Sequence, residues 1–476
     1  MNLKRILKIR LTNKGKRFFT RLAIIASLCV ISIIIISNPE ELFSKNQTAS
    51  TENESENEAE YFESDTISIN EYISNEVSDY EDLEHLDKSI NKFLKRWNIR
   101  GGALAVYNNQ KLIYSKGYGL ADVEQNIAAS PSNLFRIASM SKLITATAIM
   151  KLQEDSLLTI KDTVFGPRGI LNMPKFLNIR DRHMKEITVE QLMRHYGGFS
   201  LRRGDPLFTV RDIMRWDHLD TVPDMDGIIE HVLTKERLSY RPGSTFCYSN
   251  LGYLILSKII EVKSGQNYED YCQEHVLHPA GCFDMHLAKN LYKDKYPNEV
   301  RYYEPVTATK IPVYDANSSD SLYRSYGGNN IEGLYGAGGW IASPIEFGRF
   351  VLAIDGKDSI PDIISKESVA TMTEHNKHTI HPLGWVEIRS NGDWVRTGSL
   401  SGSSSICKYQ KNGLLWVFEM NSSSWKGSKF PHYTDYMFRS ASYHVKWPDT
   451  DLLLKSGYLS DVSNKKSSIS NQRLLN

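Results

Sequence analysis

Hydrophobic residues occur at regular spacings near both ends of the chain, with a longer and less regular middle between them. A run that begins near residue 86 has apolar residues at helical spacing, namely Ile90, Phe93, Leu94 and Trp97. Two apolar segments, 101–106 and 112–114, follow this run and are separated by Asn108 and Asn109, a pair that favours a turn. The pattern predicts a helix, then a strand, a turn and a second strand.

The C-terminal part of the chain shows strand patterns again. Three short apolar segments are separated by Asn-Gly pairs typical of tight turns: 386–388, 406–409 and 415–418. The middle, from about 143 to 350, shows mostly helical spacing and loops. Strands at both ends with helices between them predict an α+β fold, an α/β sandwich, whose N- and C-terminal segments share one antiparallel sheet with flanking helices. A mostly helical inserted lobe, at about 166–330, is expected over that sheet.

The N-terminus combines positive charge with a long apolar stretch. Residues 1–21 contain eight lysines and arginines, and residues 22–36 carry no charged side chain. This asymmetry predicts a basic cytoplasmic segment at 1–21, a transmembrane signal anchor at 22–37, and a folded body outside the cytoplasm, either periplasmic or at the cell surface. The apolar stretch is shorter than the roughly 20 residues of an average spanning helix, so a cleaved signal peptide and a secreted protein form the alternative.

The segments on both sides of the expected domain are polar. Residues 38–85 are rich in Glu, Ser, Asn and Asp and contain few large apolar residues, which predicts an acidic disordered linker. Residues 451–476 predict a loose polar tail for the same reason. The folded domain is therefore expected at 86–450.

Net charge, cysteines and histidines give no sign of a nucleic-acid partner, a disulfide scaffold or a metal site. The formal net charge of +1 gives no reason to expect a nucleic-acid partner. Cys272 and Cys282 could pair in an oxidising compartment, but buried free thiols are the favoured interpretation. Three histidines recur at three-residue spacing: His375, His378 and His381. They fall in a polar loop, which favours a solvated segment over a metal site, and no metal or organic cofactor is expected.

The segment Ser139-Met140-Ser141-Lys142 precedes a long apolar pattern that predicts a buried helix. Residues three apart lie on one helical face, so Lys142 can reach the hydroxyl of Ser139. A shielded lysine loses part of its affinity for a proton and can then activate a serine. Alone, this short pattern is a weak signal, because an ordinary serine cap on a helix has the same residues.

Two further segments make the pattern specific. Tyr248-Ser249-Asn250 follows a Pro-Gly turn and opens a helical run, and Arg396-Thr397-Gly398-Ser399 lies among the C-terminal strand segments. Together with Ser139 and Lys142, these segments resemble in order and spacing the three motifs of the beta-lactamase and transpeptidase-like serine hydrolases. That family includes class C beta-lactamases, penicillin-binding carboxypeptidases and esterases. The resemblance covers about residues 86–448.

The resemblance implies a role for each residue. Ser139 would be the acylated nucleophile, and Lys142 and Tyr248 would handle its proton. Asn250 would hydrogen-bond the substrate amide and steady Lys142, while the backbone N–H groups of Ser139 and Ser399 would form the oxyanion hole. The substrate-binding residues so implied are Asn250, Arg396, Thr397, Gly398 and Ser399. His195, at a family position near a helix end, would be a structural hydrogen-bonding residue.

Arg396 departs from the family pattern, which usually has Lys or His at this position. Its guanidinium could bind a substrate carboxylate through two parallel hydrogen bonds, or its charge could mainly lower the pKa of Tyr248. The three motifs leave the substrate open, since a beta-lactam, a D-Ala peptide from peptidoglycan and an ester all fit them. A non-catalytic protein that binds peptidoglycan or beta-lactams is the alternative from another class.

Overall fold

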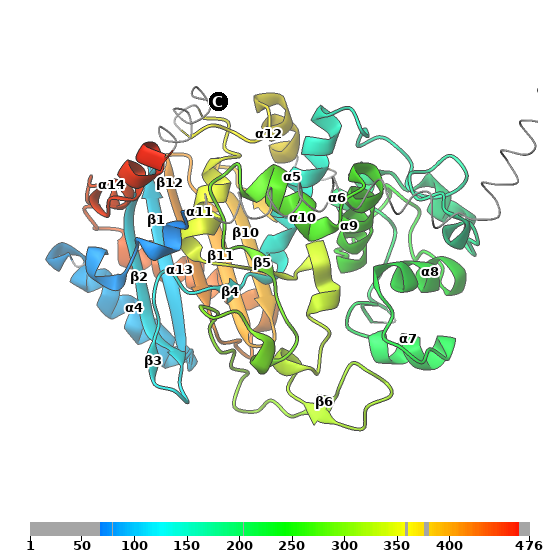
Figure 1. Cartoon of the computed structure of the whole chain (residues 1–476), viewed down its shortest axis with the longest axis horizontal. Coiled ribbons are helices and arrows are strands. Elements are labelled where there is room, and N and C mark those ends of the chain that lie inside the picture. Colours follow the sequence, from blue (N-terminus) through cyan, green and yellow to red (C-terminus); the bar gives the residue numbers. More distant parts are fainter. Residues whose placement is uncertain (1–66, 79, 203, 358–359, 376–379, 466–476) are drawn as a thin grey trace, which may run out of the picture. The chain divides into compact units, whose positions relative to one another are not determined.

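The computed structural model describes residues 67–465, apart from 79, 203, 358–359 and 376–379 (Figure 1). The predicted basic segment, the signal anchor at 22–37 and most of the predicted linker lie outside these residues. Within the part that is described, no helix combines the length and the apolar character needed to cross a bilayer. The described residues form one compact unit, so the sheet and the lobe belong to the same folded body.

An antiparallel sheet built from both ends of the domain carries the fold. Its strands among the described residues are, in spatial order, β3 (Ile127–Ala128), β2 (Lys111–Asp122), β1 (Gly101–Asn108), β12 (Leu414–Met420), β11 (Ser403–Tyr409), β10 (Trp394–Leu400) and β9 (Glu387–Ile388). β1 and β12 pair in the middle of the sheet, with Leu104 opposite Phe418. The prediction that the N- and C-terminal segments share one antiparallel sheet is confirmed.

Two helices cover one face of this sheet, α4 (Glu84–Trp97) and α13 (Phe430–Ser442). α4 buries the apolar stripe that the sequence predicts and ends at Asn98, whose φ of 56° is the left-handed conformation common after helices. Trp416 of β12 stacks on Phe438 of α13 with ring centroids 4.2 Å apart. Because helices lie on both faces of the sheet, β12 is buried along its whole length.

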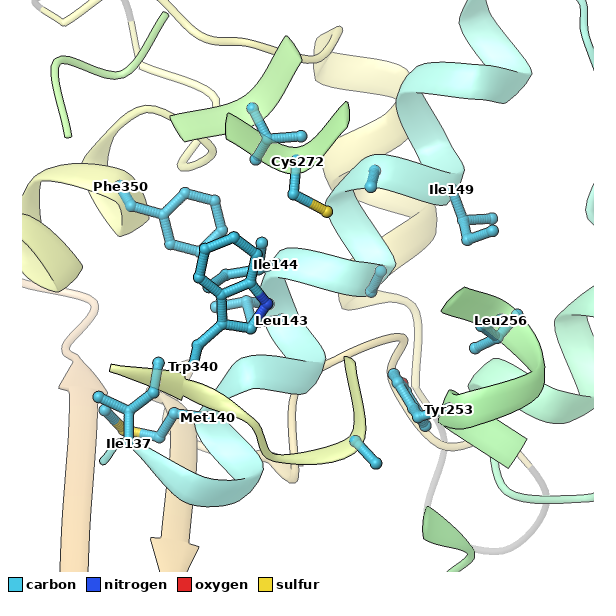
Figure 2. Packing of buried hydrophobic residues seen from close by; sticks show 14 of the residues in the cluster. Ile137, Met140, Leu143, Ile144, Ile149, Tyr253, Leu256, Cys272, Trp340 and Phe350 are labelled. Carbon is cyan, nitrogen blue, oxygen red and sulfur yellow. The ribbon is translucent and has the colours of Figure 1, made fainter. Parts of the chain in front are cut away.

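The other face carries α5 (Ser141–Glu154) and α11 (Pro344–Leu352). In α5, 11 of the 14 residues are buried, which makes it the central helix of the domain rather than a surface helix. Figure 2 shows Leu143 and Ile144 of α5 in one hydrophobic cluster with Trp340 and Phe350. Packing of this kind fixes the position of the helix that directly follows Ser139.

Helices dominate the lobe predicted at about 166–330. Those described there are α6 (Val189–Met193), α7 (Val210–Asp217), α8 (Met225–Lys235), α9 (Asn250–Ser264) and α10 (Tyr268–Cys272). The lobe also contains short strands that the sequence pattern did not predict, namely β5 (His286–Leu287), β6 (Ile311–Pro312) and β7 (Ser321–Leu322). Besides α11 and α13, the described residues after the lobe form the helices α12 (Lys366–Thr373) and α14 (Leu452–Lys455).

The folded body begins earlier than the predicted boundary at residue 86. Ile69 and Ile73, from the segment expected to be a disordered linker, are 0% and 2% exposed. The side-chain amide of Asn70 donates to Asp284 at 2.8 Å, and Ser68 bonds to the same carboxylate. Residues 67–85 are therefore part of the domain, which corrects the prediction. The apolar residues of this segment, among them Ile69, Ile73 and Val77, are few and separated by acidic and polar ones, and their packing partners lie far away in the sequence.

The domain also ends later than the predicted boundary at 450. Leu452 and Leu453 of α14 are buried, and so is Tyr458. These residues belong to the segment expected to be a polar tail. Their burial depends on contacts with the opposite end of the domain, such as the ring contact between Tyr72 and Tyr458, whose centroids are 5.5 Å apart.

Candidate active site

Three segments that are distant in sequence meet at the predicted site. Ser139 lies in the 3-10 turn η5 (Ala138–Met140) directly before α5, Tyr248 precedes α9, and the 396–399 motif belongs to β10. Ser249 starts α9 as its N-cap, since Ser249 Oγ accepts a hydrogen bond from the Gly252 N–H at 3.0 Å. The serine between the two motif residues of Tyr-x-Asn therefore has a local structural role.

The backbone around Ser139 is held under strain. A short sheet of β4 (Phe135–Arg136), β8 (Trp340–Ala342) and β5 fixes the chain ahead of the turn, and the Ile137 N–H donates to the Trp340 carbonyl at 3.1 Å. Ala138 has a φ of 50°, a left-handed conformation that costs a non-glycine residue about 1–2 kcal/mol. Strain of this kind persists where the surrounding packing determines the conformation, and it is common at active sites.

Gly398 allows β10 to approach this turn. A Cβ atom at position 398 would lie 2.1 Å from the Ile137 carbonyl oxygen and 2.4 Å from Ser405 Oγ, distances that real side chains do not adopt. β9 pairs only with Trp394 and Val395 among the described residues, so the outer edge of β10 has no strand partner from Arg396 onward. An edge of this kind is one at which an extended peptide backbone can pair with a sheet.

Lys142 and Tyr248 converge on Ser139. The Tyr248 hydroxyl donates to Ser139 Oγ at 2.8 Å, and Lys142 Nζ donates to the same oxygen at 3.3 Å. Lys142 Nζ also lies 5.0 Å from the centre of the Tyr248 ring. The structure thus brings together the three residues for which the sequence predicts nucleophile and proton-handling roles, and the spacing permits proton transfer between them.

Lys142 is fully buried with its ammonium held by oxygen atoms. It donates to Asn250 Oδ1 at 2.7 Å and to the backbone carbonyl of Ala337. Burial lowers the pKa of Lys142, and although the nearby Tyr248 opposes this shift, the charge of Arg396 adds to it.

Tyr248 is the acidic phenol of the site. Burial by itself would raise the pKa of Tyr248, but the charges of Lys142 and Arg396 outweigh burial and lower this pKa to about 8. An ordinary tyrosine has a pKa of about 10. The pKa of Tyr248 is therefore closer to neutral pH than that of an ordinary tyrosine, which suits this phenol to proton transfer.

His195 supports Tyr248 from one side. Its Nδ1 accepts a hydrogen bond from the Ser249 N–H at 3.2 Å, and its ring lies 4.4 Å from the Tyr248 ring. Burial, together with the charges of Lys142 and Arg396, lowers the pKa of His195 well below its usual value. A neutral imidazole that accepts from the backbone fits the structural role that the resemblance implied.

Arg396 faces inward rather than toward solvent. Its side chain is 1% exposed, and both Nε, at 2.7 Å, and Nη2 donate to the backbone carbonyl oxygen of Ser139. Of the two roles open from the sequence, this geometry favours the electrostatic one, because the guanidinium already holds a backbone acceptor and its charge lowers the pKa of Tyr248.

Asn250 has a second partner that the sequence did not reveal. Its Nδ2 donates to Asp205 Oδ2 at 2.7 Å, while its Oδ1 accepts from Lys142. Burial raises the pKa of Asp205, although the hydrogen bond from Asn250 and the charge of Lys142 oppose this shift. Asp205 lies in a loop between α6 and α7 with no motif around it, so only the tertiary contact shows its place in the site.

Two cavities border the site. One of about 490 Å³ is lined by Tyr248 and Asp205 together with apolar residues that include Phe199, Val232 and Leu251. The other, of about 640 Å³, is lined by Ser399, Leu400 and residues of the loops at 304–311 and 423–428. Tyr248 and Asp205 therefore border one cavity and Ser399 borders the other, and each cavity has a volume that a small acyl or peptide group could occupy.

The remaining sequence candidates lie elsewhere. His381 stacks on Phe246 with ring centroids 4.0 Å apart, and His378 lies outside the described residues. In the part of the chain that the structure describes, no three His, Cys, Asp or Glu side chains form a group that could hold a metal ion. Cys272 and Cys282 are buried free thiols, as the favoured interpretation predicted.

Comparison with known proteins places the chain among relatives with this fold. The family described as Beta-lactamase matches residues 86–433. The putative penicillin-binding protein PbpX of Bacillus subtilis strain 168 is 24% identical over 408 residues, which cover 85% of this chain and 88% of PbpX.

Two other similarities cover the chain differently. Protein flp of Staphylococcus aureus strain NCTC 8325 is 27% identical over 213 residues, 45% of this chain and 40% of flp, so the chain matches less than half the length of that curated relative. The solved D-amino acid amidase of Ochrobactrum anthropi SV3 superposes with a TM-score of 0.59 at 18% identity, over 77% of this chain and 100% of the amidase. At this identity the likeness concerns the fold.

Proposed function

The chain belongs to the beta-lactamase family of serine hydrolases, and we propose that it acts through an acyl-enzyme formed on Ser139. The observation that carries this proposal is the convergence of two proton-handling groups on one oxygen, with the Tyr248 hydroxyl at 2.8 Å and Lys142 Nζ at 3.3 Å from Ser139 Oγ. A serine held only as a helix cap would not need either group.

Acylation follows from this geometry. In the reactive form Tyr248 has lost its proton to solvent, and the neighbouring cations stabilise the phenolate. The phenolate accepts the Ser139 proton while Ser139 Oγ attacks the substrate carbonyl carbon. The backbone N–H groups of Ser139 and Ser399 hold the resulting oxyanion. When the bond to the leaving group breaks, Tyr248 returns its proton to the departing nitrogen or oxygen.

In deacylation, water is the nucleophile and Ser139 Oγ is the leaving group. A water molecule gives a proton to the Tyr248 phenolate as its oxygen attacks the acyl carbonyl, and the proton then passes to Ser139 Oγ as the acyl group leaves as a carboxylic acid. Lys142 stays protonated in both halves of this cycle. Its charge is what makes a tyrosine an adequate base below its ordinary pKa.

The proposed substrates are amides related to beta-lactams or to the D-Ala peptides of peptidoglycan. The similarity to a putative penicillin-binding protein over 408 residues supports this class, and the outer edge of β10, which has no strand partner from Arg396 onward among the described residues, suits an extended peptide. The proposed location is the outer face of a membrane, with the body tethered through residues 22–37. The basic residues before this stretch and the acidic residues after it support that orientation.

Incubation of the full-length protein with a fluorescent penicillin and, separately, with a fluorescent fluorophosphonate tests the proposal. Fluorophosphonate labelling of the wild type, absent in Ser139→Ala, is the expected result. Stable penicillin label indicates slow deacylation, and fading label indicates beta-lactam hydrolysis. Fluorophosphonate labelling without penicillin labelling would contradict the substrate class and favour an ester. Equal labelling of Ser139→Ala would contradict the nucleophile assignment.

Protease treatment of intact cells, stripped of any outer barrier, tests the location. Cleavage between residues 38 and 66 that releases the folded body is expected. A chain that is wholly protected would contradict the proposed topology.

A further inference from the structure

A carboxylate is connected to the predicted nucleophile through two side chains. Asp205 Oδ2 accepts from Asn250 Nδ2 at 2.7 Å, and Asn250 Oδ1 accepts from Lys142 Nζ at 2.7 Å. Lys142 Nζ donates in turn to Ser139 Oγ at 3.3 Å. The terminal amide of an asparagine can rotate, and only a fixed partner on its nitrogen guarantees that its oxygen faces the ammonium.

Asp205 is itself held in place. Its second oxygen accepts from the Leu207 N–H at 3.1 Å, and its backbone carbonyl accepts from the Thr209 hydroxyl at 3.1 Å. Its carboxylate lies at the wall of the 490 Å³ cavity beside Tyr248. No ion pair joins Asp205 to a Lys or Arg among the described residues. Its carboxylate contacts the site through the hydrogen bond from Asn250, and its charge also acts on Lys142 through space.

The charges around Lys142 determine whether it keeps its proton, and Asp205 is one of them. The ionisable groups that face Lys142 come from several elements: Tyr248 and Tyr253 from the α9 segment, Arg396 from β10, His195 from the loop after α6, and Asp205 from the loop before α7. Arg396 and burial favour loss of the Lys142 proton, whereas Asp205 favours its retention. A neutral Lys142 would no longer stabilise the Tyr248 phenolate.

We infer that Asp205 is a positioning residue for the proposed reaction, which orients the Asn250 amide and keeps Lys142 protonated so that Tyr248 is the group that gives up its proton. The inference rests on the proposed function of the same site. It assigns to the loop between α6 and α7 a part in nucleophile activation that the three sequence motifs do not contain.

Two substitutions separate the two effects of Asp205. Asp205→Asn keeps an oxygen that can accept from Asn250 but removes the negative charge. Asp205→Ala removes both the acceptor and the charge. Asp212→Asn is the matched control, because Asp212 lies on the neighbouring helix α7 with its side chain 67% exposed, and the substitution changes the net charge of the protein by the same amount.

The experiment measures the second-order rate of fluorophosphonate labelling against pH for the full-length protein and these variants. The wild type is expected to show a bell-shaped profile, with an acidic limb from Tyr248 and an alkaline limb from Lys142. Loss of a nearby negative charge lowers the pKa of Lys142, so the alkaline limb of Asp205→Asn should move to lower pH. The maximum rate should fall about tenfold in Asp205→Asn and about a hundredfold in Asp205→Ala, the range typical of a lost positioning contact.

The outcomes distinguish failure of the inference from failure of the proposed function. If the wild type is not labelled, the proposed nucleophile is wrong. If the wild type is labelled and Asp205→Asn lowers the rate without moving the alkaline limb, Asp205 only supports the structure and the inference is overturned. An alkaline limb that moves equally in Asp212→Asn would attribute the shift to net charge and would overturn it as well.

Discussion

The guanidinium of Arg396 donates through Nε to the backbone carbonyl oxygen of Ser139 at 2.7 Å. The residue that departs from the family pattern therefore holds the backbone of the proposed nucleophile, and its charge also lowers the pKa of Tyr248. To bind a substrate carboxylate, the buried guanidinium would have to break its hydrogen bonds to this carbonyl. Hydrogen bonds in which one partner is charged contribute about 1.5–3 kcal/mol each, so this exchange is unfavourable.

This relationship predicts the behaviour of Arg396→Gln. The substitution removes the cation, so the pKa of Tyr248 rises and the acidic limb of the rate profile moves to higher pH. Matched substrates with and without a free carboxylate should lose kcat/KM alike, because the charge acts on Tyr248 rather than on the substrate. A loss confined to the acidic substrate, measured on such a pair, would restore the carboxylate-binding role.

Tyr248→Phe removes the phenol hydroxyl and so tests its role in proton transfer. Acylation should slow by about 10²–10⁴-fold, the usual contribution of a positioned acid or base. The wild-type rate should rise with pH through about 8 as the phenolate forms, and this rise should be absent in the variant. The pH dependence of fluorophosphonate labelling checks both statements. A rise that persists unchanged in Tyr248→Phe would assign that limb to another group.

Ser139 and Lys142 should behave as one unit. Lys142→Ala is expected to reduce substrate turnover nearly as much as Ser139→Ala, and the double variant should lose little more than either single variant. Steady-state kinetics of the three variants on one substrate give the comparison. Losses that multiply in the double variant would mean that the two residues act independently.

Gly398→Ala tests the close approach of β10 to the turn before Ser139. The new methyl group would meet the Ile137 carbonyl at 2.1 Å, so the strand must shift and the melting temperature should fall. Gly252→Ala is the control, because its Cβ would find only ordinary contacts from 3.5 Å in α9 and alanine favours a helix by about 1 kcal/mol over glycine. Thermal unfolding compares the two. Equal melting temperatures for the two variants would show that β10 can shift without loss of stability.

Ile69→Ala tests whether the segment before α4 belongs to the fold. Ile69 is 0% exposed, so truncation should destabilise the domain by about 2–5 kcal/mol. Denaturant unfolding of the full-length protein measures the change. Glu71→Ala, at an exposed position in the same turn, provides the control and should change stability by less than about 0.5 kcal/mol. If Ile69→Ala leaves the free energy of unfolding unchanged, this segment is a linker and not part of the folded domain.

The sequence by itself determined the parts of this protein whose signals are local. Alternating apolar segments near both ends predicted the strands that pair as β1 and β12, and the apolar stripe around Phe93 predicted α4. The residues Ser139, Lys142 and Tyr248 were identified because a helix places residues three apart on one face and because the motifs occur in the family's order. Periodicity and motif spacing are properties of neighbouring residues, so they can be read without knowledge of distant contacts.

The tertiary structure decided what depends on residues far apart in the chain. The inward position of Arg396, the hydrogen bond between Asp205 and Asn250, and the burial of Ile69 all depend on partners more than 40 residues away. Hydrogen bonds and pKa values at a buried site depend on distance and dielectric environment, and neither follows from sequence spacing. The motifs therefore identified the proposed nucleophile and its partners, whereas only the folded arrangement showed which charges control them.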